Sequence, residues 1–352
     1  MDTIKIFNYP WHLAHQYELM KLPCTQWTWL IQHRRQYNQG PRGDMKGKFN
    51  IKEVPCYEKG KYDLALLHLD QQCFEGTLWE RGKGSLYKDV NSVIKDIPKI
   101  VIMHGTPYYP ESFPCDITEE NYKERGFTKD QIGMSSELIR RCKEAVGDNI
   151  MVTNSYQAAK QWGFGIPIWH GLDPDEWYDL PKEPRVITML SPGGLDKYYD
   201  RIFHKAVREA LYERDIMHCQ ITVDATFKKW EEYKEFVGRS LIYFHPMKEA
   251  PMSRGRTEAM LSGCCVITTN NQDADMFIKD GENGFFCGRN PDHVVQLVEL
   301  LIKNYRKAIA IGQKGKETAL EKFDIRRYQG EWADVINKAL EKHGSKKRLT
   351  LN

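Results

Sequence analysis

The chain has 352 residues, of which 41% are hydrophobic and 12% aromatic, and its formal net charge is +3. That length is ample for two or three globular domains, and so small a charge does not by itself indicate nucleic-acid binding. Nine scattered cysteines without a C-x-x-C pair exclude an obvious zinc ribbon and disfavour a disulfide framework, so we expect a reducing, cytoplasmic location. The sequence also has no signal-peptide pattern and no apolar run near the ~20 residues that span a bilayer.

Strands and helices are predicted to alternate from the N-terminus. Residues 4–8 form the first strand, and a helical pattern and a second strand at residues 28–32 follow. The first strand runs into Trp11 and His12, which are candidates for contact with an acceptor molecule.

Residues 32–52 are polar and glycine-bearing, with six Lys or Arg residues against the single acid Asp44. We expect a long surface loop. Its charge suits an anionic acceptor or peripheral contact with a membrane surface, and a solvated, variable loop is the alternative.

Two buried strands are predicted at residues 62–69 and 99–103, and the second ends in His104-Gly105. Open α/β sheets bind ligands outside the carboxyl ends of their strands, so His104 is a functional candidate, with a purely structural role as the alternative. A helix at residues 131–146, a strand at 149–153 and a helix capped by Ser155 follow. Residues 166–178 read as an irregular crossover to a second domain.

The second half repeats the alternation. Strands are predicted at residues 185–190, 219–223, 241–244, 264–269 and 285–287, with helices between them, and three helices end the chain. We expect two doubly wound α/β domains with the ligand between them: residues 1–170, residues 171–325, and a C-terminal segment 326–352. Its last helix crosses back to the first domain, and its basic tail is frayed.

The stretch from Phe244 to Gly288 contains an unusual helix start. Ser253 is placed to cap the helix, but Arg254 and Arg256 lie in its first turn, where the macrodipole disfavours cations. Gly255 between them lets another group approach the backbone. A bound anion such as a phosphate accounts for all three residues. The alternative is that both arginines point to solvent or pair with Glu249.

These features together resemble the GT-B glycosyltransferases, and more closely the retaining enzymes of glycosyltransferase family 4 (glycosyl transferases group 1). The resemblance covers most of residues 149–340 and is close to absent in residues 10–60. It rests on Glu258-Ala259-Met260-Leu261-Ser262-Gly263, the strand at 264–269, Asp275, the turn Asp280-Gly281-Glu282-Asn283-Gly284, Asn154-Ser155 and His170-Gly171-Leu172-Asp173. It implies two Rossmann-like domains facing across a cleft.

The resemblance implies a role for each matching residue. Glu258 would accept hydrogen bonds from the two ribose hydroxyls of a nucleotide, and Lys197 would bind its diphosphate with Ser253 and Arg254 or Arg256. Glu249 resembles the first family glutamate, which contacts the donor sugar, although eight residues rather than seven separate it from Glu258. His104 would contact the sugar near the reacting carbon, and His170 is a further candidate.

The implied activity is retaining transfer of a sugar from a nucleoside-diphosphate sugar, of the UDP or GDP type, to an acceptor hydroxyl on a glycan, a lipid-linked molecule or another substrate. Protein cations would stabilise the departing diphosphate, so we expect no metal ion and no cofactor. Two alternatives stay open: a nucleotide-sugar epimerase of the same fold, and a non-catalytic binder of carbohydrate or nucleic acid. We expect no nucleic-acid partner. The sequence leaves the base, the sugar and the acceptor open.

Overall fold

The computed structural model describes residues 3–9, 11–31, 45–108, 111–190, 198–222, 226–249 and 252–351. These residues form two compact units. Unit 1 contains the described residues up to Gly171 together with those from Arg326 onward, and unit 2 contains those from Leu172 to Ile325.

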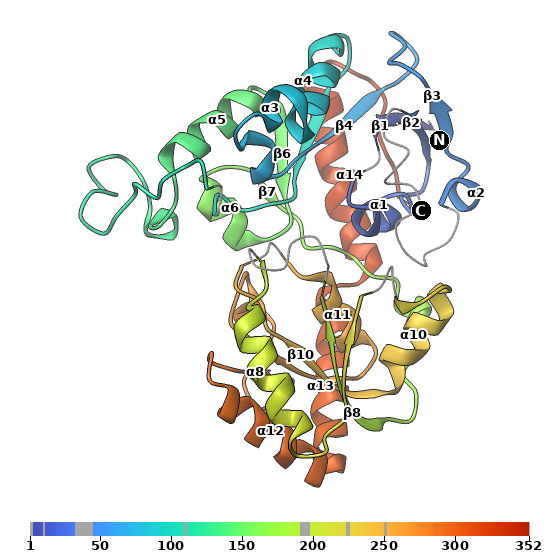
Figure 1. Cartoon of the computed structure of the whole chain (residues 1–352). Coiled ribbons are helices and arrows are strands. Elements are labelled where there is room, and N and C mark those ends of the chain that lie inside the picture. The colour runs from blue at the N-terminus through green and yellow to red at the C-terminus, as the bar shows by residue number, and fades with distance from the viewer. Residues whose placement is uncertain are drawn as a thin grey trace. The chain divides into compact units, whose positions relative to one another are not determined.

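Unit 1 is built on a seven-stranded sheet in the order β3-β2-β1-β4-β5-β6-β7, and its strands pair in parallel (Figure 1). Near-continuous burial of the central strands, such as β4 and β5, is typical of a parallel sheet covered by helices on both faces. The strands are β1 (Ile4–Asn8), β2 (Thr25–Leu30), β3 (Lys52–Val54), β4 (Leu64–Leu69), β5 (Lys99–Met103), β6 (Ile150–Thr153) and β7 (Ile166–Pro167).

The helices of unit 1 connect these strands and cover the sheet. Ser155 begins α6 as predicted, since its side chain accepts a hydrogen bond from the N–H of Ala158. The helices are α1 (Leu13–Leu19), α2 (Met45–Phe49), α3 (Leu78–Arg81), α4 (Lys83–Val93), α5 (Ser136–Val146), α6 (Tyr156–Trp162) and α14 (Ile325–Lys342).

Unit 2 is built on a five-stranded parallel sheet in the order β12-β11-β10-β8-β9. Its strands are β8 (Glu183–Met189), β9 (His218–Ile221), β10 (Ser240–His245), β11 (Cys265–Thr268) and β12 (Phe285–Phe286). Its helices are α8 (Arg201–Tyr212), α10 (Trp230–Arg239), α11 (Arg254–Leu261), α12 (Pro291–Lys303) and α13 (Tyr305–Lys322). The two sheets confirm the prediction of two Rossmann-like α/β domains.

Helix α13 packs tightly against the turn that ends α11. A Cβ built on Gly312 would lie 2.3 Å from the carbonyl oxygen of Gly263, so only glycine allows this approach. Gly263 itself has a φ of 70°, the left-handed conformation typical of a glycine that follows the end of a helix. This packing fixes the position of α11, whose other end carries the predicted anion site.

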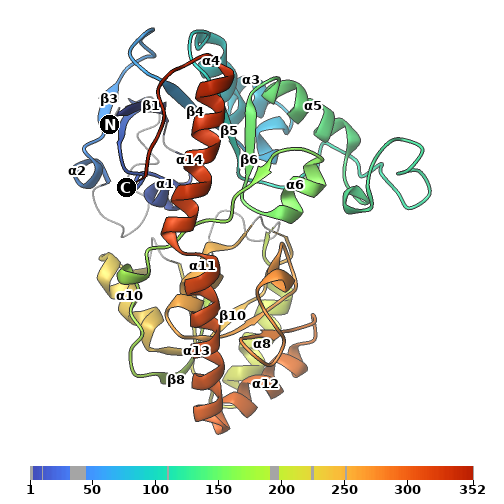
Figure 2. The same cartoon turned by 180° about the vertical axis from the view of Figure 1, so that it is seen from behind.

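The end of the chain differs from the prediction of a frayed tail. Helix α14 lies with unit 1, as the two opposite views show (Figures 1 and 2). The residues beyond it are held in place: Leu349 is buried, its backbone exchanges hydrogen bonds with the side chain of Asn337, and Lys347 forms an ion pair with Asp63 at 2.9 Å. One buried leucine therefore anchors a tail that its charges alone would leave in solvent.

Two segments were predicted incompletely. The sequence reading missed α4, and it treated residues 32–52 as one loop. Residues 32–44 lie outside the described residues, but 45–49 form α2 and 52–54 form β3. No helix within the described residues is long and apolar enough to cross a membrane.

Candidate active site

The strand orders of both units reverse at one point, and each reversal brings polar side chains to the carboxyl edge of the sheet. In unit 1 the reversal lies between β1 and β4, and in unit 2 it lies between β8 and β10. Such switch points are where open α/β sheets bind ligands. Asn8 ends β1, His68 lies near the end of β4, and His245 ends β10.

In unit 2, Ser253 occupies the N-cap position of α11 but does not cap the helix with its side chain. Its Oγ lies 2.8 Å from Nε2 of His245, whose Nδ1 lies 3.0 Å from Oγ1 of Thr268. Because the Thr268 hydroxyl donates its proton to the carbonyl of Thr269, it accepts from Nδ1–H of His245. Nε2 of His245 then accepts the hydroxyl proton of Ser253. In this arrangement the hydroxyl of Ser253 presents only lone pairs to an anion. This does not fit its predicted role, in which it would donate a hydrogen bond to the diphosphate.

The pKa of His245 lies well below the usual value because the ring is buried and faces the positive charge of Arg256. The ring is therefore neutral near pH 7, as the two hydrogen bonds require. The sequence pattern did not single out His245. Like His104, it lies at the carboxyl end of a strand.

Glu258 is 3% exposed, and both of its carboxylate oxygens have partners. Oε2 accepts a hydrogen bond from the Tyr233 hydroxyl at 2.6 Å, and Oε1 lies 2.7 Å from Nε of Arg254 one helical turn earlier. A carboxylate has about four lone-pair positions, so these two bonds leave acceptor capacity on both oxygens. The network also sets the carboxylate in one orientation.

The structure does not bring Arg254 and Arg256 to one face of α11. Residues two apart on a helix point in nearly opposite directions, so only one of the two can face a ligand. Arg254 is 13% exposed in its side chain and pairs with Glu258, whereas Arg256 has no exposed surface. The alternative in which both arginines point to solvent or pair with Glu249 does not describe them either.

Arg256 instead holds the segment after β11. Its guanidinium donates to Oδ1 of Asn271 at 2.9 Å and to the carbonyl of Gln272 at 3.3 Å, and lies over the ring of Phe277. Burial lowers the pKa of Arg256 to about 10, so the group is still charged near pH 7. A guanidinium enclosed in this way does not fit direct contact with a diphosphate.

The segment that Arg256 holds reaches Glu249. Gln272 and Asp273 have φ angles of 34° and 55°, a left-handed conformation that costs energy in residues other than glycine. The Gln272 side-chain amide donates a hydrogen bond to Oε1 of Glu249. Arg256 is thus linked to Glu249 through Gln272, and the structure brings Glu249 into this network despite its irregular spacing from Glu258.

Gly255 is explained by the protein rather than by a ligand. A Cβ built on Gly255 would lie 2.8 Å from Cε of Met189 and 2.9 Å from the hydroxyl of Tyr243. The glycine therefore lets α11 pack against β8 and β10. The close approach inferred from the sequence exists, but the approaching groups are side chains of unit 2.

In unit 1, His68 and His104 meet at the carboxyl edge of the sheet. Nδ1 of His68 lies 2.9 Å from Nε2 of His104, and Nε2 of His68 lies 2.8 Å from Oδ1 of Asn8. Burial lowers the pKa of both histidines well below the usual value, so both rings are neutral near pH 7. Trp11 stacks over His68 with an angle of 3° between the ring planes, and the His12 ring lies 4.6 Å from that of His104.

The remaining predicted residues are placed as follows. His170 is buried in unit 1, where its carbonyl accepts a hydrogen bond from Arg327. Lys197 lies outside the described residues. Among those described, no group of three or more His, Cys, Asp or Glu side chains is arranged to hold a metal ion. Metal independence stays a prediction.

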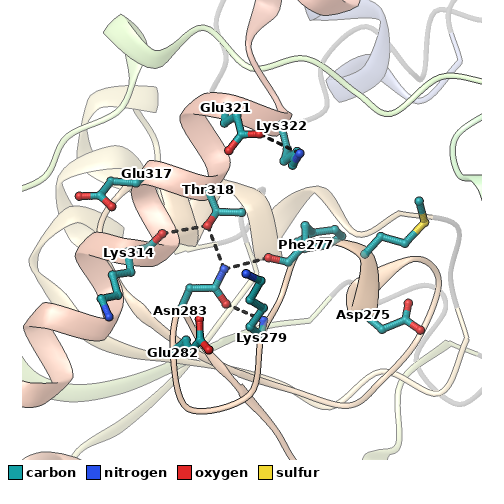
Figure 3. Close-up of a pocket in the computed structure, with 11 residues that line it drawn as sticks. Asp275, Phe277, Lys279, Glu282, Asn283, Lys314, Glu317, Thr318, Glu321 and Lys322 are labelled. Atoms are coloured by element: carbon teal, nitrogen blue, oxygen red, sulfur yellow. Dashed lines mark hydrogen bonds and ion pairs between the residues drawn. The ribbon is translucent and has the colours of Figure 1, made fainter.

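Unit 2 also has a separate cavity of about 610 Å³ between residues 275–283 and α13 (Figure 3). None of the predicted site residues lines it. Asn283 lies among its lining residues, and this side chain is already bonded to the N–H of Lys279, the carbonyl of Phe277 and the hydroxyl of Thr318. The cavity offers charged surface side chains of both signs, and nothing in its geometry selects a ligand.

Several network residues could not be found from the sequence. Tyr233 lies on α10, far from Glu258 in sequence, and Gln272 lies in an irregular segment without a motif. Asn8 and His68 belong to predicted strands, but their pairing depends on the order of the strands in the sheet. Strand order was the missing information for Asn8 and His68, and tertiary packing was the missing information for Tyr233 and Gln272.

Comparison with known proteins supports the fold and the family resemblance. Residues 213–318 match the family described as Glycosyl transferases group 1. A search of curated proteins found no match.

Solved structures share the fold at low identity. The chain is similar to HepE from Anabaena, solved in complex with UDP and glucose, with a TM-score of 0.61 at 12% identity over 95% of this chain and 100% of that one. It is also similar to sucrose-phosphate synthase from Thermosynechococcus elongatus, with a TM-score of 0.60 at 9% identity over 96% and 100% of the two chains. A glycosyltransferase from Rickettsia africae gives a TM-score of 0.56 at 12% identity over 97% and 100%.

The GT-B fold and the resemblance to group 1 glycosyl transferases are therefore confirmed, whereas the narrower resemblance to family 4 is not. The family match runs from β9 to most of α13, so it includes α10, β10 and α11, which carry the site of unit 2. The chain has the GT-B fold, and residues 213–318 of its second unit match the glycosyl transferases group 1, a match that supports a transferase enzyme with a role in glycosyl transfer.

Proposed function

We propose that the protein is a retaining glycosyltransferase that moves a sugar from a nucleoside-diphosphate sugar to an acceptor hydroxyl. The observation that carries the proposal is the Arg254–Glu258–Tyr233 network at the start of α11, beside the switch point of unit 2. Solved neighbours of the same fold bind UDP and UDP-glucose, which supports a donor of this class.

Glu258 is the residue proposed to hold the nucleotide ribose. A ribose presents two neighbouring hydroxyls, and one carboxylate with two oxygens can accept from both. The Tyr233 and Arg254 contacts hold the carboxylate rigid before a ligand arrives, which reduces the entropy lost on binding.

The diphosphate is proposed to bind at the N-terminus of α11. The N–H groups of the first helical turn and the positive end of the helix dipole favour an anion there. Arg254 adds a positive charge, and Lys197 remains a proposed partner. Arg256 acts at a distance, because it holds the segment that contacts Glu249.

In the proposed reaction the bond between the anomeric carbon and the diphosphate oxygen breaks, and the bonding electrons leave with the diphosphate. Positive charge develops on the sugar ring and negative charge on the leaving group. Preorganised donors at α11 stabilise that negative charge without needing to reorient. The acceptor hydroxyl then forms the new bond on the same face of the sugar, and its proton passes to the departing phosphate oxygen.

A thermal-shift panel of nucleotide sugars tests the proposal. A ligand that binds the folded state alone raises the midpoint according to its concentration and affinity. We expect stabilisation by at least one nucleoside-diphosphate sugar, and loss of that shift in Glu258→Gln. If no nucleotide sugar stabilises the protein while salt-sensitive binding of a polyanion persists, the chain is a binder of another class. If a nucleotide sugar is epimerised without an acceptor, the reaction is isomerisation.

A further inference from the structure

We propose that Asn8 and His68 act as positioning residues that fix the proton of His104 on Nε2, so that His104 presents Nδ1 as a hydrogen-bond acceptor to a ligand hydroxyl. The ligand, a sugar or its acceptor, follows from the proposed function. The proton positions follow from contacts within unit 1 and do not depend on it.

The direction of the chain of hydrogen bonds is set by the backbone. The N–H of Tyr9 donates to the Asn8 side chain at 2.8 Å, so the contacting atom is the amide oxygen Oδ1 and not the nitrogen. Asn8 has no exposed surface, and among the described residues its Nδ2 has no partner. The side-chain amide of Asn8 is therefore oriented so that its oxygen Oδ1, and not its nitrogen, makes the hydrogen bonds.

That oxygen selects the tautomer of His68. Oδ1 of Asn8 lies 2.8 Å from Nε2 of His68, and because Oδ1 can only accept, Nε2 must carry the proton. Gln16 competes for the same atom: its Nε2, oriented by donation to the carbonyl of Tyr9, lies 3.1 Å away. The contact with Asn8 is shorter by 0.3 Å, so it decides the tautomer.

The proton position then passes to His104. A neutral imidazole carries one proton, so with Nε2 of His68 protonated its Nδ1 holds a lone pair. This Nδ1 lies 2.9 Å from Nε2 of His104, which must therefore donate. Nδ1 of His104 is left as an acceptor, and among the described residues no hydrogen bond engages it.

The tautomer of His104 decides whether its Nδ1 accepts or donates a hydrogen bond. With the proton on Nε2, His104 accepts a hydrogen bond from a hydroxyl at Nδ1. With the tautomers reversed, the same atom would carry a proton and offer a donor instead. The two forms differ by no heavy-atom position, so Asn8 sets the polarity of the site from a distance of two hydrogen bonds.

The test is imidazole nitrogen NMR on the full-length protein labelled with ¹⁵N-histidine, which distinguishes the two neutral tautomers. Signals of His68 and His104 are assigned by their loss in His68→Phe and His104→Phe. We expect Nε2–H for both rings in the unmodified protein. A proton on Nδ1 of either ring in that spectrum overturns the proposal.

Two matched variants change the two competitors for the same nitrogen. Asn8→Leu removes the acceptor and leaves Gln16 as donor, so we expect both tautomers to reverse. Gln16→Leu removes the competing donor and should leave both unchanged. If Asn8→Leu does not fold, Asn8→Asp retains the acceptor and should keep the original tautomers; reversal in Gln16→Leu or Asn8→Asp contradicts the proposal.

A second experiment measures KM for the sugar donor or acceptor in the same two variants. Reversal in Asn8→Leu should raise it about tenfold, the size expected for one hydrogen bond turned from attraction to repulsion, and Gln16→Leu should change it little. Because the NMR result needs no turnover, a protein with the expected tautomers but no glycosyl transfer would reject the proposed function and keep the positioning role.

Discussion

The functional candidates at the carboxyl edges of the two sheets differ in charge. In unit 1 they are the neutral side chains of Asn8, His68 and His104, which hydrogen bonds join, and the Asp70–Lys83 ion pair lies at the same edge. In unit 2 the edge is charged, with Glu258, Arg254 and Arg256 in or near the first turns of α11. The same architecture thus provides two different chemical surfaces.

The difference has a physical consequence for ligands. A neutral imidazole can direct a hydrogen bond to a hydroxyl but cannot stabilise a full negative charge. A helix N-terminus with a nearby arginine can do so, and a carboxylate in the same helix can hold the ribose. We therefore assign nucleotide diphosphate chemistry to unit 2 and hydroxyl recognition to unit 1.

The largest expected effect is at Glu258. In Glu258→Gln the side chain keeps its size, but the charge that binds two ribose hydroxyls and Arg254 is lost, so nucleotide affinity should fall about 100-fold. Isothermal titration calorimetry measures it. The control is Glu282→Gln at the separate cavity of unit 2, which should bind as before. Equal affinities for Glu258→Gln and the control would remove Glu258 from the nucleotide site.

The two arginines of α11 should differ in binding rather than in stability. Arg256→Met leaves buried carbonyl acceptors without donors, and we expect a loss of about 3 kcal/mol in the free energy of unfolding. Arg254→Met breaks a largely buried ion pair and leaves the Glu258 carboxylate without its cation, so it should also cost about 3 kcal/mol in stability, and unlike Arg256→Met it should weaken diphosphate binding. Urea unfolding and calorimetry on both variants test this. A stable Arg256→Met protein with weakened binding would reverse the two roles.

The neutral histidines predict how stability depends on pH. The folded pKa values of His68, His104 and His245 lie well below 6.5, so below that pH the unfolded chain binds protons that the folded chain does not. Stability should therefore fall as the pH drops from about 6.5, by up to about 1.4 kcal/mol per pH unit for each such histidine.

Urea unfolding at pH 7 and pH 5 measures this dependence. His245→Asn should reduce its steepness, whereas substitution of the exposed His293 on α12 by Gln should not. A stability that is constant or rises between pH 7 and pH 5 would show that these rings are charged in the folded protein.

The smallest expected effect is at Tyr233. Tyr233→Phe removes one hydrogen bond to Glu258 and leaves the Arg254 pair intact, so nucleotide affinity should fall about fivefold. Calorimetry on Tyr233→Phe and on Glu258→Gln compares the two losses of nucleotide affinity. A loss as large as that of Glu258→Gln would mean that the hydroxyl contacts the nucleotide itself.

Local features of the fold were readable from the sequence. Alternating apolar runs located most strands, and Ser155 marked the start of a helix at the position where the structure has it. The helix at residues 83–93 was missed because polar residues interrupt its apolar face. The anchored tail was missed because its contacts depend on the fold: Lys347 pairs with Asp63, which is 284 residues away in the sequence.

The candidate site was readable only in part. The motif around Glu258 pointed to the right helix, but two arginines in one helical turn looked equivalent until the structure showed Arg256 fully buried and Arg254 partly exposed beside Glu258. Ser253 likewise fits a cap by its position, but its hydroxyl bonds to His245, whose other ring nitrogen contacts Thr268 because β10 pairs with β11. Motifs identify elements, whereas roles depend on the direction in which each side chain points.

The central claim is retaining glycosyl transfer, and the configuration of the product tests it most directly. The protein is incubated with the nucleotide sugar that stabilises it and a panel of hydroxyl acceptors, with and without EDTA, and the anomeric configuration of the product is followed by proton NMR. We predict a glycoside with the configuration of the donor, formed equally well with the chelator present. A product of inverted configuration, or a sugar altered while still attached to its nucleotide, would contradict the account.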